Sequence, residues 1–270
     1  MPLAAVLGAL AIGSTAANGA LGYDVLKTNS VRYHVVTADL ASRKLSPRTV
    51  ASERLTSVWN LISKSEASAA ITGTFFAPKA QRPVADVLID GLLVSKGSLG
   101  TAVGVTWNGD VEIFDRPTGQ PVDWGNYRYG LRGTVRLIRG GVVCPDPKSQ
   151  SFKDSRLWSR AARTGLGVTS RGKLVMIATK SNVTLSEMGA AMLQRGVREA
   201  VSLDGGVRLA STSTARWWSR PAANSVTCSS SLWATRWNGT GPETDSDLGA
   251  AVESAKFGFA LPCRYHPRIQ

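Results

Sequence analysis

Two stretches of the chain repeat one another: Thr101–Ile113 reads TAVGVTWNGDVEI, and Thr164–Met176 reads TGLGVTSRGKLVM. Thr, Gly, Val, Thr and Gly recur in register, and the β-branched residues among them are typical of strands. Asn108-Gly109 is a strong signal for a two-residue turn, and Arg171-Gly172 takes its place in the second copy. Each stretch therefore predicts a β-hairpin.

A helix and a short strand are expected after the second hairpin. Thr184 and Glu187 have the spacing of a capping box, which predicts a helix that Gly196 ends. Residues 200–203 are apolar except for one serine and predict a buried strand that leads into Asp204-Gly205.

The first half of the chain shows the same order of elements. Residues 31–40 predict a strand, the apolar spacing over 55–62 predicts an amphipathic helix, and 69–71 predict a short strand that leads into Thr72-Gly73. A duplicated hairpin-helix-strand unit accounts for both halves and brings the two glycine turns together at equivalent sheet ends. We therefore expect an α+β fold, a mainly antiparallel sheet with helices packed on one face.

Three segments are expected along the chain. Residues 1–22 are predicted to be a signal or leader segment, because their apolar run suits a secretory signal and is too short to span a bilayer. Residues 23–212 are predicted to form the main domain, and 213–270 a loop-rich extension. The leader predicts a secreted, periplasmic or cell-envelope protein. An apolar strand or a disordered leader remains the other interpretation of residues 1–22.

The composition limits the partners and cofactors. The 32 Lys and Arg residues against 19 Asp and Glu residues give a net charge of +13, which attracts polyanions. Nucleic-acid binding rests on this charge alone, since no helix-turn-helix, RNP or zinc-finger pattern is present. With three cysteines and two histidines at unsuitable spacings, the sequence predicts no metal site, and it contains no nucleotide-binding loop, so no cofactor is expected. Cys228 and Cys263 could form a disulfide in an exported protein.

The segment Leu203–Gly206 (LDGG) places a carboxylate at the end of a buried strand, beside two glycines. Glycine lets a ligand approach the main chain closely, and successive amides can bind an anion. A plain β-turn is the other interpretation of Asp204-Gly205. Arg163 precedes the second hairpin and could bind phosphate through two parallel hydrogen bonds, or it could be one more solvated arginine.

Four segments resemble, in order, the motifs of the phosphodiester glycosidase family. The family's motifs are Asn-Gly-Gly-Phe-Phe, a Gly-Gly strand entry, Arg-Thr-Ala-hydrophobic-Gly and Leu-Asp-Gly-Gly. The corresponding segments here are Ile71–Phe76 (ITGTFF), Ile138–Gly141 (IRGG), Arg163–Gly167 (RTGLG) and Leu203–Gly206 (LDGG). The family includes bacterial exported proteins linked to exopolysaccharide, so the resemblance implies a phosphate-bearing glycan or another anionic polysaccharide as partner.

The resemblance also implies a chemistry, cleavage of the glycosidic C–O bond of a sugar-1-phosphodiester. Asp204 would act as general base on water or stabilise an oxocarbenium-like centre, and Arg163 would stabilise the leaving phosphate. Further substrate contacts are predicted from hydroxyls, main-chain amides and one guanidinium: Thr72, Gly73, Thr101, Thr164, Gly205, Gly206 and Arg208.

Two departures from the family pattern leave an alternative open. Thr72 stands where the family has Asn, and Val207-Arg208-Leu209 replaces small and hydroxyl-bearing residues. These changes favour a second hypothesis, a non-catalytic module of the same fold that binds a polyanion or phosphoglycan.

Overall fold

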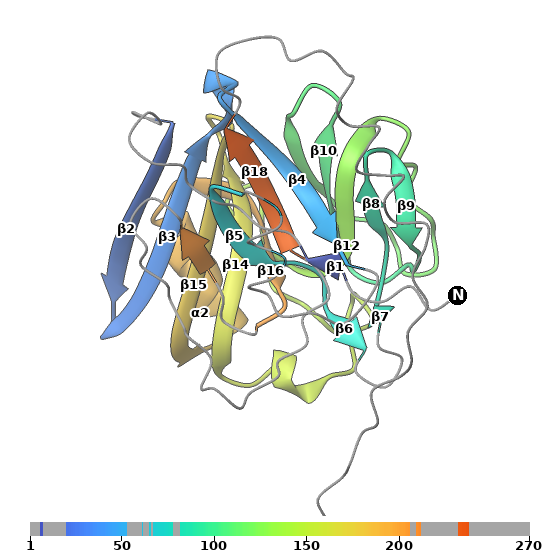
Figure 1. Ribbon diagram of the computed structural model, residues 1–270. Coiled ribbons are helices and arrows are strands. Elements are labelled where there is room, and N and C mark those ends of the chain that lie inside the picture. The colour runs from blue at the N-terminus through green and yellow to red at the C-terminus, as the bar shows by residue number, and fades with distance from the viewer. Residues whose placement is uncertain are drawn as a thin grey trace, which may run out of the picture. The chain divides into compact units, whose positions relative to one another are not determined.

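Antiparallel strands dominate the computed structural model, which describes residues 6–7, 20–52, 61, 65, 67–77, 82–205, 209–211 and 232–237 (Figure 1). These residues belong to one compact unit, Met1–Asn238, while the second unit, Gly239–Gln270, lies outside the described residues. No helix in the described ranges has the length and hydropathy needed to cross a membrane.

The larger sheet has eleven described strands. Its main path runs through β11 (Val111–Phe114), β10 (Thr101–Thr106), β12 (Tyr127–Arg139), β16 (Val197–Leu203), β14 (Ala161–Thr169), β15 (Lys173–Val183), β3 (Val31–Asp39) and β2 (Leu21–Thr28). Three further strands lie off this path: β8 (Val87–Ile89) and β13 (Val142–Val143) pair with β12, and β9 (Leu92–Ser95) pairs with β8.

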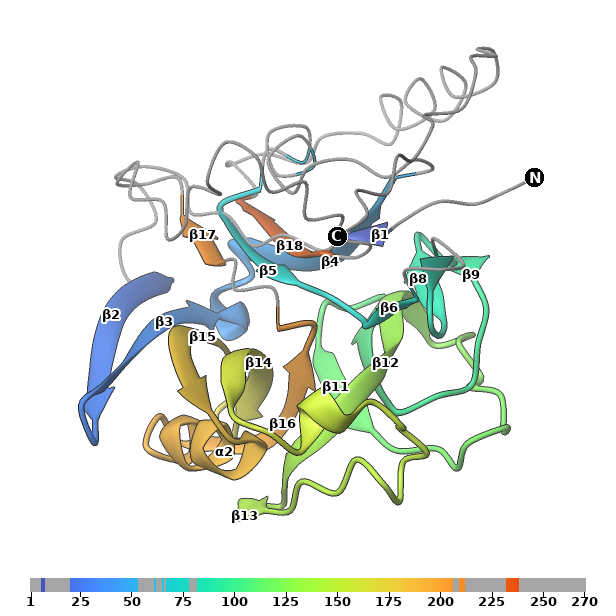
Figure 2. The ribbon, with the colours of Figure 1, turned by 90° about the horizontal axis from the view of Figure 1, so that it is seen from below.

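A smaller sheet lies on one side of the larger one (Figure 2). Its five described strands are, in order, β1 (Val6–Leu7), β4 (Leu45–Ala51), β18 (Leu232–Trp237), β5 (Ala69–Thr72) and β17 (Leu209–Ser211). The remaining described elements are the pair β6 (Phe76–Ala77) and β7 (Arg82–Pro83), the helix α2 (Leu185–Leu193), and the 3₁₀ turns η1 (Leu40–Ser42) and η2 (Ser155–Leu157).

Both faces of the larger sheet are buried at its centre. On β15, Met176 packs into a core that also holds Ile71 of the smaller sheet, whereas its neighbour Ile177 packs with Met188 of α2. Successive side chains of a strand point to opposite faces, so one strand supplies two cores. Figure 2 shows the resulting layers, with α2 on the face of β14, β15 and β16 opposite the smaller sheet.

Both predicted hairpins are confirmed. β10 pairs with β11, β14 pairs with β15, and Gly109 and Gly172 occupy the turns with positive φ. The predicted capping box is also confirmed, because the Thr184 hydroxyl accepts from the Glu187 amide and the Glu187 carboxylate accepts from the Thr184 amide.

The predicted α+β class, a sheet covered by helices, is wrong. Among the described residues α2 is the one α-helix, and the main core lies between two antiparallel sheets. The physical reason is that four more stretches form strands, although we predicted no helix or strand there: 21–28, 45–51, 127–139 and 232–237. Sheet packed on sheet buries the apolar face that we expected helices to cover.

The predicted segment boundaries can be compared with the structure only in part. β18 lies beyond residue 212 and pairs with β4 and β5, so that stretch of the predicted extension contributes to the smaller sheet. The leader 1–22 lies outside the described residues except for β1 and residues 20–22, and the helix predicted at 55–62 does so except for Leu61.

Candidate active site at the end of strand β16

The main chain of Asp204 is held in place by three hydrogen bonds. Its amide donates to the carbonyl of Gly73 at 3.0 Å, where the smaller sheet's β5 ends. Its carbonyl accepts from the Thr72 hydroxyl at 2.7 Å and from the Thr164 hydroxyl at 3.0 Å. The two threonine hydroxyls also lie 3.0 Å apart. The glycine-bearing ends of β5 and β16 therefore meet, and they fix Asp204 before any ligand arrives.

The Asp204 carboxyl group is a weaker acid than an ordinary aspartate. Burial raises the pKa of Asp204 to about 6, although the Arg156 guanidinium and the Gly205 amide act in the opposite direction. The residue as a whole is partly exposed. Removal of water disfavours the charged form of a carboxylate, which explains the direction of the shift. A carboxyl group with a pKa near neutrality can take up and release protons at the pH where most enzymes work.

Gly205 must be glycine for a steric reason. A Cβ at position 205 would lie 2.7 Å from the carbonyl oxygen of Ala162 on β14, too close for any side chain. The main chain after Asp204 therefore passes directly against the neighbouring strand, and the Gly205 amide stays near the carboxylate.

The cation near Asp204 is Arg156, on the turn η2. Asp154 caps this turn by accepting from the Arg156 amide at 3.0 Å, and its carboxylate also pairs with the Arg156 guanidinium at 2.5 Å. The Arg156 side chain is 81% exposed, so most of its guanidinium faces water. An exposed guanidinium beside a proton-exchanging carboxylate can bind an anionic substrate.

Arg163 is buried, with 4% of its surface exposed, and its guanidinium is directed at main-chain carbonyls. Nη2 donates to the carbonyls of Arg156 at 2.9 Å, Ser159 at 2.7 Å and Leu157 at 3.4 Å, and Nε donates to that of Val183 at 3.4 Å. Within the described part of the chain, no hydrogen bond or ion pair joins Arg163 to Asp204. Arg163 thus holds the turn that carries Arg156, which the sequence alone could not show.

The structure brings some of the predicted site residues together and separates another. Thr72, Gly73 and Thr164 adjoin Asp204, but both threonine hydroxyls are buried and hydrogen-bonded within the protein. Thr101 lies elsewhere, where its hydroxyl donates to the Asp115 carboxylate at 2.7 Å. The other two predicted contacts lie outside the described residues: Gly206 and Arg208.

Sequence reasoning missed Asp154 and Arg156. An Asp followed two residues later by Arg suits a capped turn, which is the one local signal that these residues carry. Their proximity to Asp204 arises from the fold, since about fifty residues of chain separate them, and no spacing rule reports such a contact.

The described residues contain no group of three or more His, Cys, Asp or Glu side chains that could hold a metal ion. Cys144 is a free, exposed thiol. The predicted partners of a disulfide, Cys228 and Cys263, lie outside the described residues.

Comparison with known proteins gives a family match and a shared fold. The phosphodiester glycosidase family model matches residues 65–227, which is more than half of the chain and includes Arg163 and Asp204. This match confirms the resemblance seen in the four motifs. None of the curated proteins matches the chain.

Two solved structures share the fold at low sequence identity. The catalytic domain of zebrafish N-acetylglucosamine-1-phosphodiester alpha-N-acetylglucosaminidase, auto-inhibited by its pro-peptide, has a TM-score of 0.61 and 16% identity, covering 84% of this chain and 86% of that one. A hypothetical protein from Synechocystis has a TM-score of 0.59 and 14% identity, covering 80% of this chain and 61% of that one.

Proposed function

Because the chain belongs to the phosphodiester glycosidase family, we propose that it hydrolyses the glycosidic bond of a sugar-1-phosphodiester in a phosphate-bearing glycan. Family membership indicates a glycosidase-type hydrolase. The observation that carries the finer proposal is the Asp204 carboxylate, which is fixed at a strand end and whose pKa burial raises to about 6. The similar fold of the zebrafish glycosidase, whose name specifies a sugar-1-phosphodiester, supports this substrate class.

In the proposed reaction a water oxygen forms a bond to C1 of the sugar while the bond from C1 to the phosphate oxygen breaks. Ionised Asp204 takes a proton from that water. The phosphate monoester leaves with the electron pair of the broken bond, and as a stable anion it needs little protonation. Asp204 then returns its proton to solvent or to the product phosphate.

Charge on the leaving phosphate is stabilised, in this proposal, by the Arg156 guanidinium and by main-chain amides that begin at Gly205. Arg163 is assigned a positioning role in place of the direct phosphate contact expected from the sequence, because its Nε and Nη2 atoms donate to main-chain carbonyls. Gly206 and Arg208 remain predicted substrate contacts. The predicted leader, residues 1–22, supports export to the cell envelope as part of the same proposal.

The test uses methyl phosphodiesters of glucose, galactose and N-acetylglucosamine 1-phosphate in water enriched in ¹⁸O. We expect turnover of at least one of them, with the label in the hydroxyl at C1 and none in methyl phosphate. Label in the phosphate would show cleavage of the P–O bond and would overturn the glycosidase assignment.

The alternative function is a binding module for a polyanion or phosphoglycan that performs no chemistry. The observation that favours it is Thr72, which replaces the family's Asn and directs its hydroxyl inward to the Asp204 carbonyl. Calorimetric titration beside the turnover assay separates the two functions, because saturable binding without product supports the module.

A further inference from the structure

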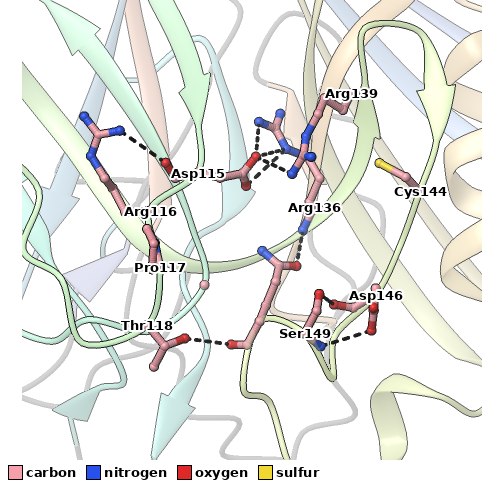
Figure 3. A pocket seen from close by; sticks show the side chains of 11 residues that line it. Asp115, Arg116, Pro117, Thr118, Arg136, Arg139, Cys144, Asp146 and Ser149 are labelled. Atoms are coloured by element: carbon pink, nitrogen blue, oxygen red, sulfur yellow. Dashed lines mark hydrogen bonds and ion pairs between the residues drawn. The ribbon is translucent and has the colours of Figure 1, made fainter.

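A second polar pocket lies away from Asp204, at the end of β11 (Figure 3). Its volume is about 390 Å³, within the range that holds small-molecule ligands. We call it the Asp115 pocket and define it by its lining residues Gly100, Asp115, Arg116, Pro117, Thr118, Arg136, Arg139, Cys144, Asp146, Ser149 and Gln150. Neither Asp204 nor Arg163 lines it.

The base of the Asp115 pocket is a network of ion pairs and hydrogen bonds. Arg136 is buried and donates to the Asp115 carboxylate at 2.8 Å and to Glu199 at 2.7 Å. The Thr101 hydroxyl donates to the same Asp115 carboxylate at 2.7 Å, and Gln150 donates to Thr101 at 2.5 Å. These groups use one another's hydrogen-bonding capacity, so they form the frame of the pocket and leave ligand binding to other side chains.

Two arginines flank this frame with unused donors. The Arg139 side chain is 64% exposed and, among the described residues, makes one polar contact, from Nη2 to the Asp115 carboxylate at 2.8 Å. Within the described part of the chain, the Arg116 guanidinium makes one long hydrogen bond of 3.4 Å, to the Asp115 carbonyl, and lies over the Phe114 ring at 5.7 Å from its centroid, which leaves N–H groups for a ligand. Figure 3 shows Arg116 and Arg139 on either side of Asp115. Each therefore keeps N–H groups that can donate to an oxyanion at the rim of the pocket.

The remaining lining groups suit a sugar. The hydroxyls of Thr118 and Ser149 donate to the carbonyls of Gln150 and Asp146, so their oxygens can accept hydrogen bonds from sugar hydroxyls. The pocket is also larger than an isolated oxyanion requires. We infer that the Asp115 pocket binds a sugar phosphate, with the phosphate held by the remaining donors of Arg116 and Arg139 and the sugar hydroxyls toward Thr118 and Ser149. This site is separate from Asp204, and the inference does not depend on the proposed catalytic function.

Cys144 provides a local reporter, because its thiol lines the pocket and is free and exposed. The rate at which iodoacetamide alkylates Cys144 is followed by peptide mass spectrometry, with and without glucose 6-phosphate, while calorimetry gives the dissociation constant. We expect glucose 6-phosphate to slow alkylation at Cys144 and to bind more tightly than glucose, inorganic phosphate or glucuronate.

The variant that tests the pocket is Arg116→Gln combined with Arg139→Gln. It is expected to weaken binding of glucose 6-phosphate by about tenfold or more and to remove the protection of Cys144. Arg171→Gln is the matched control, because Arg171 is an exposed arginine in the turn between β14 and β15. Asp204→Asn should bind like the wild type.

Three outcomes would overturn the inference. They are protection of Cys144 that survives in the double variant, loss of binding in Asp204→Asn, and no saturable binding of glucose 6-phosphate to the wild-type chain. Tighter binding of glucuronate than of glucose 6-phosphate would overturn the assignment of phosphate as the recognised group.

Discussion

Asp204 and Asp115 each follow directly after a strand of the larger sheet, yet the protein shifts their pKa values in opposite directions. Burial raises the pKa of Asp204 to about 6. Burial also acts on Asp115, but hydrogen bonds from Arg136 and Thr101 and the charge of Arg139 hold the pKa of that carboxyl below its usual value. Burial raises the pKa of both carboxyls, but at Asp115 the donors and positive charges outweigh it, so Asp204 is the aspartate of the two that can exchange a proton near neutrality.

Two buried arginines, Arg136 and Arg163, also differ in the groups that surround them. Arg136 pairs with two carboxylates, whereas Arg163 satisfies only main-chain carbonyls. The first neutralises acids and the second fixes a turn. The aspartates therefore differ in their ability to exchange a proton and the arginines in the groups that they hold in place, and single substitutions can test both differences.

The largest expected effect is on turnover in Asp204→Asn. Loss of the proton acceptor should lower kcat by about 10³-fold, within the range for a missing general base. The variant should remain folded, because the hydrogen bonds that hold residue 204 come from its main chain. Circular dichroism beside the turnover assay checks both statements, and wild-type turnover in the folded variant would remove Asp204 from the chemistry.

Arg163→Ala should cause the largest loss of stability. Four carbonyls lose their donor, two of them on the turn that carries Arg156 and a third just after it, at Ser159. The free energy of unfolding should therefore fall by about 2–4 kcal/mol. Urea titration measures this change against Arg171→Ala, an exposed control. Arg163→Lys should recover part of the turnover through its remaining donors. If Arg163→Ala lowered turnover without changing stability, a direct catalytic contact would replace the positioning role.

Asp115→Asn should separate stability from chemistry. Arg136 would lose a charged partner while buried, which should lower the free energy of unfolding by about 2 kcal/mol. Turnover should stay near the wild-type value at temperatures where the variant is folded. A variant as inactive as Asp204→Asn would show that the two aspartates share one function.

Arg156→Gln is expected to have the smallest of these effects. Its exposed guanidinium contributes little to stability, but kcat/KM should fall by about tenfold if it stabilises the leaving phosphate. The pKa of Asp204 should also rise above its wild-type value, because Arg156 acts to lower it. Unchanged kcat/KM and an unchanged pH profile would contradict both roles.

The local features of the fold were predictable from the sequence, and the packing of its layers was not. The turns at Gly109 and Gly172 and the capping box at Thr184 depend on a few adjacent residues, and the structure contains them. Strand β12 was not predicted from the sequence, because Arg132 and Arg136 occupy buried positions in it. Arg132 donates to several carbonyls, which makes its burial favourable, but a sequence shows only a charged residue.

The candidate site was predictable to a similar extent. The LDGG segment identified Asp204, and the duplicated order of elements implied that the ends at Thr72-Gly73 and Asp204-Gly205 would meet, as their hydrogen bonds show. Which arginine lies near the carboxylate depends on where the fold places η2. The sequence therefore indicated Arg163, whose donors turn toward that loop, and gave no signal for Arg156.

The most direct test of the central claim is the pH dependence of kcat/KM on a sugar-1-phosphodiester, whose phosphate stays ionised across the range. If Asp204 must be ionised to accept a proton, kcat/KM should fall tenfold per pH unit below about pH 6, with one ionisation. An acid limb near pH 4, the ordinary range for an exposed aspartate, would contradict the account, because the acidity of Asp204 would then not control the reaction.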